Sequence, residues 1–148
     1  MKILYQGSPG AYSHLAAKEL YPDAKIISCK TFDECFVKAE EDINSRIIIP
    51  ESNRITGNIG IEYLIFKHRL NIYAEHFHRV EHNLLGMQGT KLKDIKNVYS
   101  HAQALSQCSE FIKKNNINEN VRADTAGSAA LISNNKNKND AAIASKLS

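Results

Sequence analysis

Strand-like and helix-like segments alternate along almost the whole chain, and this alternation constrains the fold more than any other feature. Short apolar runs typical of buried strands are followed by stretches in which apolar residues recur at helical spacing. This order is typical of α/β proteins, in which helices connect the strands of a largely parallel sheet. The predicted strands are residues 2–6, 24–28, 46–50, 82–87, 97–99 and 141–144, with a further extended segment over 71–80. The predicted helices begin near residues 11, 31, 61, 100 and 125.

Three of the predicted helices begin with residues that are suited to cap them. Thr31, with Glu34 three residues later, forms a capping-box pattern. We expect Ser100 to be the N-cap of a single helix that reaches Ile112, with Gln103 in the third position of the box. Asp124 is the expected N-cap of the last predicted helix. Each cap would accept a hydrogen bond from an N–H group of the first helical turn.

Composition and charge exclude several classes of protein. Apolar residues make up 43% of the sequence and charged residues 24%, which excludes wholesale disorder. No apolar run approaches the roughly 20 residues that cross a bilayer, so we expect no membrane partner. The net charge is +3, and the basic residues are scattered along the sequence. This argues against a nucleic-acid partner but suits a small anionic substrate. The cysteines Cys29, Cys35 and Cys108 lack zinc-type spacing and indicate a reducing compartment, so we expect a cytoplasmic protein.

Three turns that lead from a predicted strand into the next helix are rich in small and hydroxyl residues, namely residues 8–13, 100–103 and 124–128. In α/β sheets such turns gather at the carboxyl ends of the strands, where ligands usually bind. Backbone N–H groups and the positive end of the helix dipole favour anions at these places. The turns would suit a small dicarboxylate, although each one taken singly is better explained as an ordinary helix cap.

The histidines and cysteines offer weaker signals. His76 and His78 lie two residues apart on the expected extended segment, so they face the same side, and His82 is close by. Such a pair is able to ligate zinc, but no acidic or cysteine partner stands at metal-binding spacing, and we predict no metal site. Cys35 and Cys108 fall on apolar helix stripes, where packing is the expected role.

Four segments form an ordered set of motifs that periodicity alone does not explain. They are Tyr5-Gln6-Gly7-Ser8-Pro9-Gly10-Ala11-Tyr12-Ser13-His14, Ser100-His101-Ala102-Gln103-Ala104-Leu105 with Gln107-Cys108, Asp124-Thr125-Ala126, and Ala141-Ala142-Ile143-Ala144-Ser145. In this order and at these separations they resemble the prephenate dehydratase family, over the whole chain. The resemblance implies a lyase that converts prephenate to phenylpyruvate in L-phenylalanine biosynthesis, without a metal ion or an organic cofactor.

The resemblance also implies an architecture. Proteins of this family have two α/β lobes similar to type II periplasmic binding proteins, with mostly parallel sheets, helices on both faces and substrate held between the lobes. We therefore expect residues 1–74 to form a first lobe and residues 75–148 a second. The family's T-R-F motif and ACT regulatory domain would lie beyond Ser148. We expect the first lobe to be incomplete without that returning segment, the 148-residue chain to be inactive alone, and the full-length protein to be a homodimer or homotetramer.

The same resemblance assigns candidate site residues. Asn53 and Gln103 would be catalytic amide side chains. The expected substrate-binding residues are Ala11, Tyr12, Ser13, Arg54, Gly57, Ser100, His101, Thr125 and Ala126. The chain departs from the family pattern P-I-E-N-S-x-x-G at Ser52 and Arg54, and from S-H-P-Q at Ala102.

A non-catalytic interpretation stays open beside the enzymatic one. A two-lobed module of the same type would serve as an intracellular sensor of a small anion. The turns that favour anions, and the departures from the family pattern at Ser52 and Arg54, fit that alternative. The ordered set of dehydratase motifs favours the enzyme.

Overall fold

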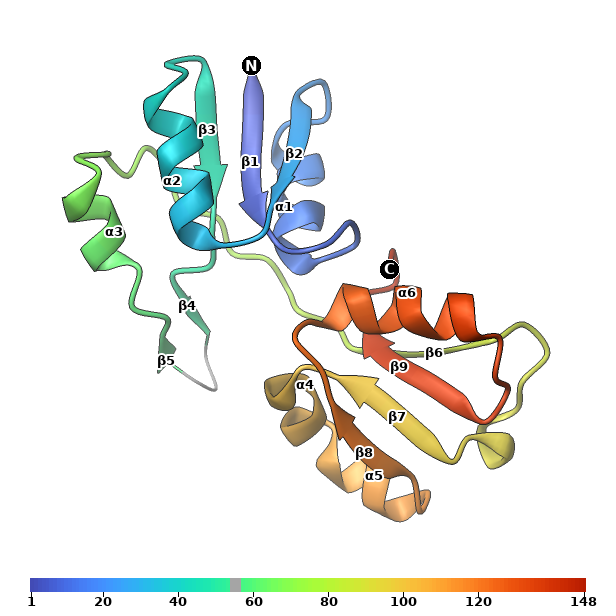
Figure 1. The fold of residues 1–148 in the computed structure, drawn as a ribbon. Helices are drawn as coiled ribbons and strands as arrows, with labels where there is room; N and C mark the ends of the chain where they lie inside the picture. The colour runs from blue at the N-terminus through green and yellow to red at the C-terminus, as the bar shows by residue number, and fades with distance from the viewer. Residues whose placement is uncertain (54–56) are drawn as a thin grey trace. The chain divides into compact units, whose positions relative to one another are not determined.

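The computed structural model describes residues 1–53 and 57–148 and separates the chain into two units (Figure 1). The first unit comprises residues 1–8 and 12–78, and the second comprises residues 9–11 and 79–148. The division expected from the sequence lies between residues 74 and 75, whereas the main segment of the first unit extends to His78.

A three-stranded parallel sheet forms the centre of the first unit (Figure 1). Its strands lie in the order β2 (Lys25–Cys29), β1 (Lys2–Gln6) and β3 (Ser45–Ile48). The central strand β1 is buried along Ile3, Leu4 and Tyr5, as expected for a parallel strand that is covered on both faces. The third strand ends before Pro50, because proline has no N–H group to donate to a ladder.

Helices α1 (Tyr12–Leu20) and α2 (Phe32–Glu40) cover opposite faces of this sheet (Figure 1). The chain passes through α1 to reach β2 on one side of β1, and then through α2 to reach β3 on the other side. Crossovers between parallel strands are right-handed, so this reversal of direction puts the two helices on opposite faces. The predicted cap of α2 is confirmed, since Thr31 Oγ1 accepts from the N–H of Glu34 at 3.1 Å.

The remainder of the first unit has little regular structure. A short antiparallel pair, β4 (Ser52–Asn53) with β5 (Gly57–Asn58), precedes helix α3 (Glu62–Lys67). The strand expected over residues 71–80 is absent, because these residues, all of them described, form no ladder. The alternating pattern of this segment is compatible with a strand, but a strand also needs a neighbour that exchanges backbone hydrogen bonds with it. That prediction was wrong.

The second unit is built on a four-stranded sheet in the order β6 (Asn83–Gly86), β9 (Asp140–Ala144), β7 (Asn97–Ser100) and β8 (Asn118–Val121). Strands β7, β8 and β9 are parallel, and β6 runs antiparallel along one edge. Strand β8 was not predicted, because its sequence N-E-N-V is polar and largely exposed at the opposite edge.

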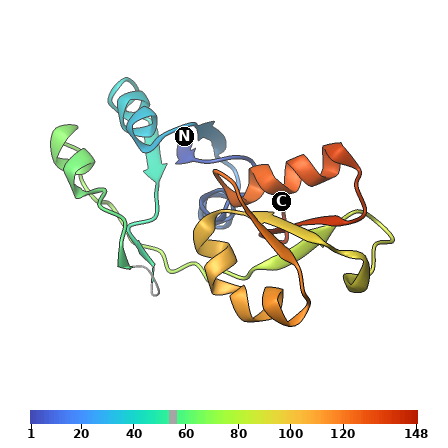
Figure 2. The same ribbon diagram turned by 60° about the horizontal axis from the view of Figure 1, so that its bottom comes forward.

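Figure 2 shows helix α6 (Thr125–Asn135) on one face of this sheet and helices α4 (Ala102–Gln107) and α5 (Ser109–Lys114) on the other. The single helix expected from Ser100 to Ile112 is therefore two short helices that meet at Cys108, and its N-cap is His101 instead of Ser100. Ser100 is still part of strand β7, where its hydroxyl is used within the sheet. A short 3-10 helix, η1 (Leu92–Asp94), precedes β7.

Apolar residues from β7, β9, α4 and α5 meet in the core of the second unit. The buried members of this cluster are Ile95, Val98, Ala104, Leu105, Ile112, Ile117, Ala141 and Ile143, and Cys108 packs against them. Cys35 packs likewise with Leu4 and Cys29 in the first unit, so the packing role predicted for both cysteines is confirmed. The predicted α/β class, with largely parallel sheets and helices on both faces, is confirmed as well. None of the described helices is long and apolar enough to cross a membrane.

Candidate functional site

The carboxyl ends of β7, β8 and β9 lie along one edge of the second sheet, because these three strands are parallel. Ser100, Val121 and Ala144 are the last residues of the three strands. Helix α4 starts directly after β7, and α6 starts shortly after β8. The predicted segments 100–103 and 124–128 are thus brought to the same edge, where open α/β sheets usually bind ligands.

At the first of these helix starts, His101 is the N-cap and its Nδ1 accepts from the N–H of Gln103 at 3.3 Å. His101 and Gln103 are both exposed. The cap uses the backbone of Gln103, so the amide side chain has no part in it. Ser100 differs from its neighbours, since it is fully buried and its hydroxyl donates to the carbonyl oxygen of Ile143 at 2.6 Å. The Ser100 side chain joins β7 to β9.

Helix α6 begins with the cap that the sequence predicts. The Asp124 carboxylate accepts from the N–H of Gly127 at 2.6 Å, and the Ser128 hydroxyl donates to the carbonyl oxygen of Asp124 at 2.7 Å. A Cβ atom at position 127 would stand 2.9 Å from the carboxylate, so only glycine leaves room for this cap. Thr125 and Ala126 form the first helical turn, Thr125 half-buried and Ala126 buried.

Arg122 is a cation at this edge that sequence reasoning missed. Its guanidinium carbon lies 5.0 Å from the centre of the Tyr99 ring, and its backbone N–H donates to the Ser100 carbonyl oxygen at 2.8 Å. With Asp124 and Gly127 it lines a pocket of about 240 Å³ beside the start of α6. A single arginine after a polar edge strand carries no sequence signal, because its position depends on β8 being part of the sheet.

Residues 9–11 belong to the same edge of the second unit, although they precede α1 in the chain. The Gly10 carbonyl oxygen accepts from the Ser145 hydroxyl at 2.6 Å, directly after strand β9. Gly10 has a φ of +95°, and a Cβ there would stand 2.7 Å from Ser148 Cα. Gly10 is therefore required by both its backbone conformation and this close approach. Ala11, a predicted substrate-binding residue, follows it in this segment.

The other predicted site residues lie in the first unit. Tyr12 and Ser13 form the first turn of α1 and are half-buried, and the Tyr12 ring lies 6.3 Å from that of His78. Asn53 and Gly57 pair across β4 and β5. Arg54 lies outside the described residues. The structure thus gathers one group of the predicted residues at a single sheet edge of the second unit, namely Ser100, His101, Gln103, Thr125 and Ala126.

His14, the last residue of the first family motif, contacts strand β1. Its ring stacks on Tyr5 with centroids 5.1 Å apart and the planes inclined by 9°. Burial, and then the nearby charge of Lys18, lower the pKa of His14 below its ordinary value of 6.5. Burial raises the pKa of the Tyr5 hydroxyl.

Taken together, the second unit offers an anion a helix start, an exposed amide and an exposed guanidinium on one sheet edge. Among the described residues, the group whose side chains converge as metal ligands is Glu19, His76 and His78 in the first unit. Sequence reasoning noted the two histidines but missed Glu19, which is distant in the chain.

The comparisons with known proteins agree with one another. The sequence pattern of the prephenate dehydratase family matches residues 3–148. Arogenate dehydratase 2 of Petunia hybrida is 37% identical over 146 residues, which are 98% of this chain and 37% of that protein. The chain therefore spans little more than a third of the length of this curated relative.

Two solved structures extend the likeness to the fold. A structure described as GqqA, a novel type of quorum quenching acylase, is 33% identical with a TM-score of 0.91, over 99% of this chain and 54% of that one. The prephenate dehydratase of Staphylococcus aureus is 25% identical with a TM-score of 0.75, over 98% of this chain and 55% of that one. With the family pattern matched across nearly every residue, the chain belongs to the prephenate dehydratase family.

Proposed function

We propose that the whole protein catalyses the decarboxylating dehydration of prephenate to phenylpyruvate, a step of L-phenylalanine biosynthesis. The match of one family pattern to residues 3–148 is the observation that carries this proposal. The site geometry supports it, because the motif segments 100–103 and 124–126 lie at the sheet edge where a small anion is expected to bind.

The reaction needs positioning and one proton. Prephenate carries two carboxylates and a ring hydroxyl. The bond between the ring and its carboxylate breaks and releases carbon dioxide, and the electron pair enters the ring. The ring C–O bond breaks at the same time, and the hydroxyl leaves as water after accepting a proton. Because the ring becomes aromatic, the protein's tasks are to orient the dianion, supply that proton and exclude bulk water.

We assign the binding of one carboxylate to the start of α6, where Thr125 and Ala126 present the first turn of an eleven-residue helix. The exposed Gln103 amide would donate to substrate. Arg122 adds a cation beside the α6 start and would strengthen carboxylate binding. None of these groups requires a metal ion or an organic cofactor for its role.

The test uses the entire reading frame, sequenced through and past the Ser148 codon, with phenylpyruvate formation as the readout. Gln103→Ala is expected to lower kcat by about 10²- to 10³-fold, the usual cost of losing one donor in a dry site. The helix cap survives this change, because His101 accepts from the backbone N–H of residue 103. Gln88→Ala, at an exposed glutamine of the same unit, is the matched control and should keep full activity.

Three results would redirect the proposal. Tight binding of prephenate without turnover would favour the small-anion sensor. Turnover of arogenate with no turnover of prephenate would identify arogenate as the substrate, as the name of the Petunia relative indicates for that protein. Hydrolysis of an N-acyl-homoserine lactone is a second candidate activity, and it is measured in parallel. It is favoured by the TM-score of 0.91 with the quorum quenching acylase and by the 34% identity with the bifunctional N-acyl-homoserine lactone acylase/prephenate dehydratase of Komagataeibacter europaeus. Turnover by residues 1–148 alone would contradict our expectation that this stretch is inactive.

We further propose a cytoplasmic location and a homodimer or homotetramer of the whole protein. The three cysteines are unpaired, and Cys29 and Cys35 are buried, which fits a reducing compartment. Cell fractionation tests the location, and light scattering on the purified whole protein tests the assembly. A monomer at micromolar concentration would contradict the assembly.

A further inference from the structure

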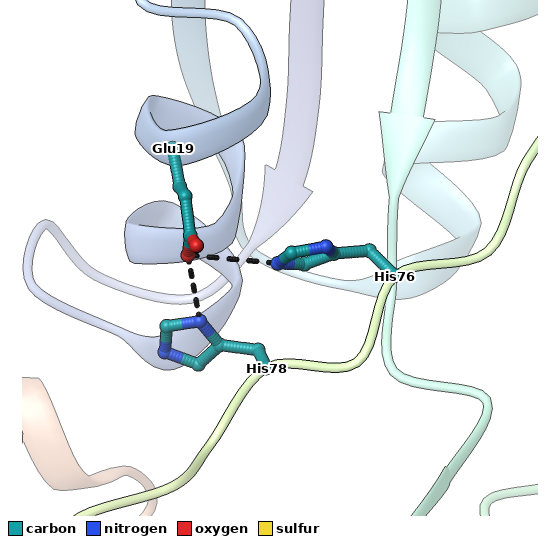
Figure 3. A group of neighbouring side chains, drawn as sticks. All are labelled: Glu19, His76 and His78. Atoms are coloured by element: carbon teal, nitrogen blue, oxygen red, sulfur yellow. Dashed lines mark hydrogen bonds and ion pairs between the residues drawn. The ribbon is translucent and has the colours of Figure 1, made fainter.

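Three side chains of the first unit converge on one point at the end of helix α1. Figure 3 shows the Glu19 carboxylate reaching from α1 toward two histidine rings on the segment that follows α3. His76 Nε2 lies 3.5 Å from Glu19 Oε2, and His78 Nδ1 lies 3.2 Å from the same oxygen. The two rings are 6.2 Å apart between centroids, each with a nitrogen directed at the carboxylate (Figure 3).

We propose that Glu19, His76 and His78 form a binding site for a divalent transition-metal ion, with zinc as the best-fitting member of the class. Two imidazole nitrogens and one carboxylate oxygen are the donor set that zinc takes in sites which keep an open position. All three ligand atoms lie within 4.8 Å of one another. Water would complete the coordination.

The distances agree with this assignment. In a tetrahedral site with metal–ligand bonds of 2.0–2.1 Å, two ligand atoms stand about 3.3 Å apart. The two oxygen–nitrogen separations, 3.2 and 3.5 Å, fall on either side of that value. The two ring nitrogens lie within 4.8 Å of each other, and rotation of these partly exposed side chains can adjust their separation to that of a bound ion.

The surroundings allow an ion to enter and give the site a structural effect. The side chains of His76 and His78 are 27% and 22% exposed and that of Glu19 is 58% exposed, so the site is open to solvent. Residues 71–78 form no helix or strand, so few backbone bonds hold this segment. A bound ion would fasten it to α1 through two coordination bonds, at the residues where the first unit ends.

Titration of the metal-free protein with zinc chloride by isothermal calorimetry tests the proposal. Wild-type protein is expected to bind one ion. Each of His76→Ala, His78→Ala and Glu19→Gln should weaken binding at least about tenfold, since even outer residues of metal sites cost 10- to 100-fold. His82→Ala removes a histidine of the second unit and is the matched control, expected to bind as wild type does.

A second readout separates this site from adventitious binding to thiols or other histidines. Cobalt(II) replaces zinc as the probe, because a four-coordinate cobalt ion absorbs visible light strongly and an aqueous one does not. The absorption should appear at one equivalent with wild type and His82→Ala, and should be lost with Glu19→Gln. Circular dichroism of each metal-free variant confirms its fold. Equal binding by wild type and all three site variants, or loss with His82→Ala, would overturn the proposal.

Discussion

In the first unit, surface ion pairs join helix α3 to helix α2, whereas in the second unit the helices pack on apolar clusters against the sheet. Lys67 of α3 lies 2.7 Å from Asp33 of α2, and the buried ring of His68 lies 3.1 Å from the Glu40 carboxylate. In the second unit, the ion pair between Arg79 and Glu81 lies outside the helices and strands and is well exposed.

The apolar clusters differ in the opposite sense. Among the described residues, Leu4, Cys29 and Cys35 form one buried cluster of the first unit, beside other buried residues such as Ile3, Tyr5 and Phe36. The second unit gathers eight buried residues in one cluster and four more in another. Exposed ion pairs contribute little to stability and are screened by salt, whereas buried apolar surface stabilises the fold in proportion to its area, by about 25 cal/mol per Å². The same α/β architecture is therefore stabilised in the two units by different proportions of surface ion pairs and buried apolar contacts.

We expect the largest loss of stability from a truncated side chain in the core of the second unit. Leu105 is 1% exposed, and Leu105→Ala should lower the free energy of unfolding of the second unit by about 2–5 kcal/mol. Hydrogen exchange of the β9 amides reports on this unit. Leu92→Ala, at a leucine 45% exposed in the same unit, is the control and should cost under about 1 kcal/mol.

Leu4→Ala in the first unit should cost less stability than Leu105→Ala in the second. Leu4 is also buried, but it borders a surface pocket lined by Ile27 and Lys38. The space left by the truncated side chain would open toward water, so the closed cavity would be smaller. The loss in the free energy of unfolding should therefore fall at the lower end of the same range, about 2 kcal/mol. Hydrogen exchange of the β1 amides measures it. A loss equal to that of Leu105→Ala would break the comparison.

Helix caps should give a smaller difference of the same kind. Asp124 bonds the N–H of Gly127 at 2.6 Å, and Thr31 bonds that of Glu34 at 3.1 Å. Asp124→Ala should cost the second unit about 1–2 kcal/mol and Thr31→Ala the first unit about 0.5–1 kcal/mol, because aspartate is the stronger cap. Asp124→Asn keeps an acceptor and should cost only a few tenths. Chemical denaturation of each variant checks this order, and a larger loss at Thr31 would reverse it.

The parts of the fold that the sequence predicts are those with local causes. Strand β1 and helix α1 follow from apolar spacing and from Pro22, and the Thr31 and Asp124 caps follow from their own side chains. Strand β8 and the false strand over 71–80 show the limit, because strand pairing is decided by distant neighbours. Ser100 was misassigned as a cap because its bond to Ile143 joins strands far apart in the chain.

The candidate site divides in the same way. The segments 100–103 and 124–126 were found from motif and cap signals, and the sheet places them on one edge. Arg122 and Glu19 were missed, since each becomes relevant only through a tertiary neighbour. His76 and His78 were correctly seen as a pair, but their acidic partner comes from a helix that no spacing rule connects to them.

The smallest expected effect is a loss of first-unit stability in acid. The Lys67 ammonium, which donates to Asp33, lowers the pKa of that carboxyl below 3.8, and the Lys38 ammonium lowers the pKa of Glu34 below 4.5. Lys2 does the same to the pKa of Asp42. A carboxyl whose pKa is lower in the folded state stabilises the fold above its unfolded pKa, and this contribution disappears as the pH falls through the folded pKa.

We therefore expect β1 amide protection to be constant from pH 7 to about pH 5 and to decline below about pH 4. Protection factors, from which the intrinsic pH dependence of exchange is removed, measure the decline. These carboxylates are exposed, so solvent and salt screen them, and about 0.5 M salt at pH 7 should reproduce part of the loss. Lys38→Met removes the main cause of the lowered Glu34 pKa and should flatten the acid decline in part, while the N–H of Lys30 still lowers that pKa. An unchanged acid profile in that variant would show that the Lys38–Glu34 pair does not contribute to the acid sensitivity of the first unit.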